Sequence, residues 1–104
     1  MAAISREVVE GLQRQGEDEQ IVYTITTTPW GSDPSNVVVV VTDESDDSEV
    51  VTDDVTSGSA SVSGDVITTP IIQALTAKHL YRVEVKFTCG GNVFECYFRL
   101  QGER

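Results

Sequence analysis

One histidine and two cysteines are the side chains of this chain best suited to nucleophilic or acid–base chemistry. His79 comes just before a strand-like run that begins at Leu80, and Cys89 lies ten residues further along that run. A cysteine and its histidine base must lie within hydrogen-bond distance, which this separation along one extended strand prevents. The sequence has no Gly-x-Ser-x-Gly turn and no Cys-x-x-Cys pair. We therefore expect no enzyme activity, no catalytic residue, no cofactor and no metal site.

A dense run of carboxylates is the second candidate for chemistry. The acidic segment, residues 43–54, contains seven of them: Asp43, Glu44, Asp46, Asp47, Glu49, Asp53 and Asp54. Calcium takes about six to eight oxygen ligands, so this segment is a candidate calcium loop. It lacks the glycine and the terminal glutamate of an EF-hand loop. We favour a solvated acidic loop that protects the neighbouring valine-rich strand from pairing with other chains.

A β pattern runs through most of the chain from Ile21 onward. Runs rich in β-branched and aromatic residues, bounded by turn residues, predict strands. These runs cover residues 21–26, 37–42, 59–63, 65–72, 80–89 and 92–100, with a short strand at 49–51. We predict an all-β fold, an immunoglobulin-like β-sandwich of about seven antiparallel strands spanning residues 21–104.

Residues 1–20 differ from the rest of the chain because they are mostly polar. Ile4, Val8, Val9 and Leu12 recur at helical spacing, but an isolated helix of this length is marginal in water. We expect an N-terminal arm that is mobile or forms a short helix, and that becomes ordered against a partner. Its deletion is expected to leave the domain folded and to impair assembly.

A hairpin at the C-terminal end is specified by several features together. Gly90 and Gly91 separate two alternating runs and suit a two-residue turn with positive φ at both positions. This turn places one apolar set on a single face: Tyr81, Val83, Val85, Phe87 and Cys89 opposite Leu100, Phe98, Cys96, Phe94 and Asn92. Cys89 and Cys96 would then lie more than about 10 Å apart, beyond the reach of a disulfide. We predict two buried thiols.

Two aromatic residues are candidate contacts with a partner. Trp30 lies in a Pro-Trp-Gly loop, where we favour packing at the edge of the core over full exposure. Tyr97 falls on the polar face of the hairpin, beside Arg82, Glu84 and Lys86, and is the better candidate.

The charge of the chain limits its partners. The net charge is −10, which argues against binding to nucleic acid or to an anionic membrane surface. Residues 1–77 hold fourteen acids and two bases, whereas residues 78–104 hold three acids and five bases. Such asymmetry could favour head-to-tail homo-oligomers, although we favour the simpler interpretation that both are solvated surfaces. The first residues lack a secretory pattern, so we expect the protein in a cytoplasm or in a particle assembled there.

Several stretches resemble a known group of proteins. They are residues 23–31, 62–70 and 75–87, followed by the turn at 90–95. Over residues 17–103 the chain resembles small hypothetical proteins encoded among the structural genes of tailed phages and prophages. The resemblance implies an immunoglobulin-like protein of the virion or of its assembly, in the neck, the tail or the capsid decoration. Members of the group commonly have glycine where this chain has Lys78.

Two functions follow as hypotheses. The first is a non-catalytic structural or assembly protein of a phage particle, located in the virion or in the bacterial cytoplasm during assembly. Its partners would be other virion or assembly proteins, with no nucleic acid and no membrane. The alternative is a surface or carbohydrate-binding β-sandwich module that binds calcium through the acidic segment. The second hypothesis predicts a higher melting temperature in calcium.

Overall fold

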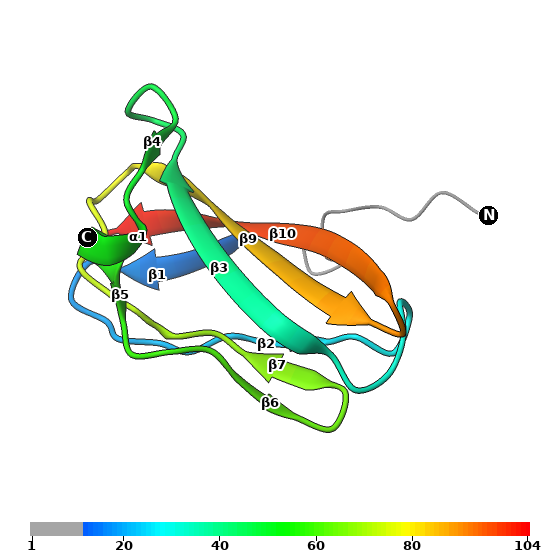
Figure 1. Ribbon diagram of the computed structural model, residues 1–104. Coiled ribbons are helices and arrows are strands. Elements are labelled where there is room, and N and C mark those ends of the chain that lie inside the picture. The colour runs from blue at the N-terminus through cyan, green and yellow to red at the C-terminus, as the bar shows by residue number, and fades with distance from the viewer. Residues whose placement is uncertain (1–11) are drawn as a thin grey trace.

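The computed structural model describes residues 12–104, which form strands and one short helix. Figure 1 shows a larger sheet and a smaller sheet on opposite sides of the molecule. The larger sheet has the order β1 (Gln13–Gly16), β10 (Asn92–Glu103), β9 (Leu80–Cys89), β3 (Ser35–Asp43) and β4 (Glu49–Val50). The smaller sheet has the order β2 (Thr24–Thr26), β7 (Val66–Thr68) and β6 (Ser61–Ser63).

Two short strands and the helix complete the described fold. They are β5 (Thr56–Ser57) and β8 (Ile71–Ile72), which pair with each other, and α1 (Thr52–Val55). The expected all-β class with several antiparallel sheets is confirmed, with ten strands instead of about seven. Among residues 12–104, no helix has the length and apolar character that a membrane span requires.

The core lies between the two sheets and takes side chains from both. Val83 and Val85 from β9 and Ile67 from β7 are completely buried, and Ile25 from β2 is nearly so. Alternation of apolar and polar residues places one face of each strand inward. Burying each of these side chains stabilises the fold by about 1.5–3 kcal/mol.

The predicted hairpin is confirmed in register and in turn geometry. Cys89 pairs with Asn92 and Tyr81 with Leu100, as the turn at Gly90 and Gly91 requires. Both glycines have positive φ, 55° and 84°. Cys89 and Cys96 are buried, and no disulfide joins them. The turn therefore fixes which side chains of β9 and β10 enter the core.

Residues 1–20 do not form an arm throughout, because Gln13–Gly16 belongs to the larger sheet. Gln13–Gly16 forms β1, which pairs in parallel with Leu100 to Glu103 of β10, so the sheets are not antiparallel throughout. Residues 1–11, with most of the predicted helix, lie outside the described residues. A deletion of residues 1–20 would remove β1, so the expectation that the domain tolerates it is not supported.

The region from β3 to β5 contains the short strand predicted at residues 49–51, which is β4 over Glu49–Val50, and a helix that was not predicted. β3 pairs with β9, and a bulge between Ser35 and Val38 includes Asn36, whose φ is 52°. β4 then runs back beside the end of β3, and α1 follows at once. The helix was not predicted, because four residues with two aspartates carry no helical periodicity.

Candidate functional site

Trp30 lies at the edge of the core, as predicted. Its ring meets the ring of Phe87 edge-on, with 5.8 Å between the ring centroids. Its backbone N–H donates a hydrogen bond of 2.8 Å to the carbonyl of Thr27. The side chain is half-buried and packs against the core cluster, so part of its surface stays accessible. A contact between Trp30 and a partner remains a prediction.

Tyr97 lies on the outer face of the larger sheet, as the hairpin register predicted. The guanidinium of Arg82 on β9 lies 4.0 Å from the centroid of the Tyr97 ring. Tyr97 is half-buried and stands across the ladder from Glu84. A cation over an aromatic face stabilises the pair by about 0.5–1 kcal/mol at an exposed site. The ring is thereby held in place on a charged outer face.

An ion pair joins the acidic and the basic parts of the sequence. Arg99 on β10 lies with Nε 3.5 Å from Oε1 of Glu44, within the acidic segment. This contact is a charge pair without a hydrogen bond. Nε of Arg99 and Oε1 of Glu44 are both buried, and neither has a hydrogen-bond partner within the described residues. A base of the C-terminal strands thus lies beside the acidic segment, and head-to-tail association remains a prediction.

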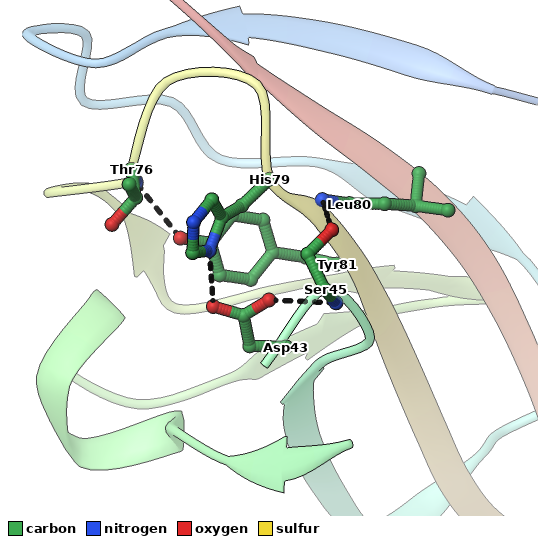
Figure 2. Close-up of polar contacts among 6 residues, drawn as sticks. All are labelled: Asp43, Ser45, Thr76, His79, Leu80 and Tyr81. Carbon is green, nitrogen blue, oxygen red and sulfur yellow. Dashed lines mark hydrogen bonds and ion pairs between the residues drawn. The ribbon is translucent and has the colours of Figure 1, made fainter. Parts of the chain in front are cut away.

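A polar cluster joins the end of β3 to the start of β9 (Figure 2). Oδ2 of Asp43 lies 2.8 Å from Nδ1 of His79, and Oδ1 accepts a hydrogen bond of 3.0 Å from the backbone of Ser45. The Ser45 hydroxyl accepts a hydrogen bond of 2.9 Å from the backbone of Leu80. Asp43 is only 5% exposed, so its assignment to a solvated acidic loop was wrong.

This cluster contains the three residue types of a hydrolytic triad in a different arrangement. Figure 2 shows the imidazole of His79 and the hydroxyl of Ser45 on opposite sides of the Asp43 carboxylate. A triad needs the hydroxyl hydrogen-bonded to the second imidazole nitrogen. The cluster therefore serves to fix two strands. No local sequence pattern indicates this cluster, because Asp43 and His79 meet only through the pairing of Asp43 with Tyr81 in the β3–β9 register.

The turn before β9 is held by a second polar contact (Figure 2). The hydroxyl of Tyr81 accepts a hydrogen bond of 2.8 Å from the backbone N–H of Thr76. Lys78 has φ of 72°, a left-handed conformation that favours glycine. Its N–H donates to the carbonyl of Gly102, and any side chain at Gly102 would collide with the carbonyl oxygen of Thr76. The turn thus packs tightly against the end of β10.

Apart from Asp43 and the half-buried Glu44, the carboxylates of the acidic segment are exposed, and they do not converge on one point. A side-chain hydrogen bond with Asp46 raises the pKa of Glu49, and the negative charge of Asp46 adds to this effect. Across residues 12–104, no three carboxylate, histidine or cysteine side chains are placed to hold one metal ion. Solvent-exposed carboxylates that repel each other attract cations non-specifically but do not form a defined metal site.

Comparison of the chain with protein-family models, with curated proteins and with solved structures found no match. The arrangement of side chains must therefore carry the functional argument. It consists of a charged outer sheet face around Tyr97, a valine-rich strand next to an acidic segment, and polar contacts that fix the strands.

Proposed function

We propose that the chain is an immunoglobulin-like module that acts as a non-catalytic structural or assembly protein of a phage particle. The contact between Tyr81 and Thr76 carries the fold part of this proposal. Immunoglobulin-like domains have a tyrosine near the start of strand F whose hydroxyl bonds to the backbone a few residues upstream. Tyr81 stands at the start of β9 in the same relation to Thr76.

The strand order supports the same fold. The order β10-β9-β3-β4 corresponds to strands G, F, C and C′ of an immunoglobulin sandwich, and β2-β7-β6 corresponds to B, E and D. The tryptophan and the disulfide of antibody domains have no counterpart here. Val39 on β3 takes the place of the tryptophan, and Val83 on β9 and Ile25 on β2 take the places of the two cysteines. The core is apolar at these positions, which suits a domain that does not depend on oxidation.

The assembly role rests on the sequence resemblance and on the surfaces of the fold. A small rigid sandwich with a charged outer face around Tyr97 provides a surface for docking other virion or assembly proteins. Symmetric particles use many copies of such units. We place the protein in the virion, as a neck, tail or capsid-associated adaptor, and in the bacterial cytoplasm during assembly.

Mass spectrometry of purified particles from an induced culture of the source strain tests this role. Stoichiometric peptides of this chain in the particles support a virion component, and the copy number separates capsid, neck and tail. Particles that form without the protein contradict a virion role and leave assembly as the remaining part of the proposal. Particles that form normally after deletion of its gene contradict that part too.

The calcium-binding alternative has less support. Asp43 faces His79, and the remaining carboxylates of the acidic segment do not converge. If calcium bound at a built site, millimolar calcium would raise the melting temperature well above the effect of matched magnesium, by ligand linkage. Equal effects of the two ions indicate screening of the acidic segment alone.

A further inference from the structure

One edge of the larger sheet stays open along β3. On one side, β3 pairs with β9 from Val38 to Asp43. On the other side, β4 pairs only with Thr42 and Asp43, and the N–H of Val51 bonds to the carbonyl of Val41. The chain then leaves the sheet into α1. Within the described part of the chain, no strand pairs with residues 37–40 on that side, which we term the valine edge.

The valine edge presents backbone groups that another strand could use. The N–H of Val41 donates to the Thr52 hydroxyl and its carbonyl accepts from Val51, so both groups point away from β9. Backbone direction alternates along a strand with a period of two, so the N–H and carbonyl of Val39 point the same way. The N–H and carbonyl of Val39 therefore face the side of β3 on which β4 pairs further along the strand.

The side chains on this edge offer an apolar surface without a protecting charge. Val38 is 47% exposed on the outer face, and Val40 beside it is half-buried. Natural sheets protect their edges with charged residues, proline or bulges. Here the bulge between Ser35 and Val38 affects only Val37 of the valine edge, and the acidic segment lies after the edge, so neither interrupts Val38 to Val40.

The charges around the valine edge determine which kind of partner strand can pair with it. The acidic segment lies directly beyond the valine edge, and Asp46, Asp47 and Glu49 are exposed there. Lys86 and Glu84, the neighbours of Val38 and Val40 on β9, are of opposite sign and leave the valine edge itself nearly neutral. A second copy of the chain would bring its own acidic segment and a net charge of −10. A basic strand is therefore favoured over self-pairing.

We propose that the valine edge docks an extended basic segment of a partner protein, which adds to the larger sheet beside β3. Alternate apolar side chains of this segment would pack on Val38 and Val40, while its lysines or arginines lie against the acidic segment. This inference adds to the proposed assembly role a binding surface and the chemistry of the partner. It rests on that role in one respect, namely that the chain binds another protein.

A peptide titration followed by NMR tests the proposal on the purified full chain. The probe is a short synthetic peptide in which valine and threonine alternate and two lysines stand at one end. We expect saturable binding, shifts centred on β3, and slower hydrogen exchange of the Val39 amide. A matched peptide with two glutamates in place of the lysines should bind at least about ten-fold more weakly, because of the acidic segment.

Two variants with matched controls make the test specific. Val38→Lys places a charge on the docking surface and should weaken binding at least about ten-fold, while Val93→Lys, at a more exposed valine of β10, should not. Glu49→Lys on β4 should weaken binding roughly five-fold, and Asp18→Lys, beyond β1 at the opposite edge of the sheet, should leave it unchanged.

Three results would overturn the proposal. They are shifts that map away from β3, equal binding of the lysine and glutamate peptides, and a Val39 amide already protected in a dimer without peptide. The last result would assign the edge to a second copy, and sedimentation would reveal it. None of these results depends on particles, so a failed virion assignment and a failed docking site are distinguishable.

Discussion

The side-chain carbonyl of Gln15 accepts a hydrogen bond of 2.7 Å from the hydroxyl of Tyr23. The amide nitrogen of Gln15 donates to the carbonyls of Ile72, at 2.7 Å, and Glu19, at 2.9 Å. Gln15 is only 1% exposed, so these bonds are made away from water. The ring of Tyr23 also packs against Phe98 of β10, with centroids 5.1 Å apart. One amide therefore joins β1 to two other parts of the domain.

Gln15→Ala should be strongly destabilising. The substitution removes the acceptor of the Tyr23 hydroxyl and one of the two hydrogen bonds of the Ile72 carbonyl, which keeps the bond from the N–H of Ile21. We expect the free energy of unfolding to fall by about 1–3 kcal/mol. Chemical denaturation measures the change. The matched control is Arg14→Ala on the same strand, whose exposed contact with Glu103 contributes less than about 1 kcal/mol. Equal losses in the two variants would show that the amide network does not hold β1.

Stability should fall steeply at high pH because of Tyr23. Burial raises its pKa to about 12, and the negative charge of Glu19 adds to this effect. In the unfolded chain the phenol ionises at about pH 10. Between about pH 10 and 12 the unfolded state therefore binds fewer protons than the folded state. The contribution of Tyr23 is thus complete below about pH 10 and is lost as the pH rises through 12.

Denaturation midpoints of the protein and of Tyr23→Phe across this range measure the effect. The variant cannot ionise at this position, so its stability should decline less with pH than that of the parent chain. Parallel declines would mean that Tyr23 ionises normally. Tyrosinate absorbance provides an independent check, because Tyr23→Phe should remove a late component of the titration.

Tyr81→Phe should loosen the turn before β9 without changing the fold. It removes the acceptor for the Thr76 N–H and keeps the ring in the core, so we expect a loss of about 1 kcal/mol. Hydrogen exchange of the Thr76 amide should become faster in the variant, which a loss of packing elsewhere would not cause. Unchanged exchange at Thr76 would contradict a role for this hydroxyl.

Lys78→Gly should stabilise the protein, because Lys78 has a φ of 72°. Relief of the left-handed strain outweighs the greater entropy of glycine in the unfolded chain, for a net gain of about 0.5–1 kcal/mol. Lys86→Gly in the middle of β9 is the control and should lower stability by a similar amount. A loss at both positions would show that the Lys78 side chain makes a contact that matters more than its backbone.

The fold was predictable where local features agreed. The β9–β10 hairpin combines a two-glycine turn with alternating side chains, and its register and buried thiols follow from those residues alone. β1 was missed because Gln-Arg-Gln-Gly has no apolar alternation and pairs with residues near the other end of the chain. The contact of Asp43 with His79 was missed for the same physical reason, since it depends on a pairing between distant strands.

The parallel pairing of β1 with β10 sets the order in which this protein can mature during its synthesis. Gln13 pairs with Leu100 and Gly16 with Glu103, so β1 cannot pair until residues 100–103 have left the ribosome. The β9–β10 hairpin closes locally, whereas docking β1 closes a very long loop and gains little until the hairpin exists. Ribosome-bound chains halted before β10 should therefore expose β1 and its glutamine to proteases and chaperones.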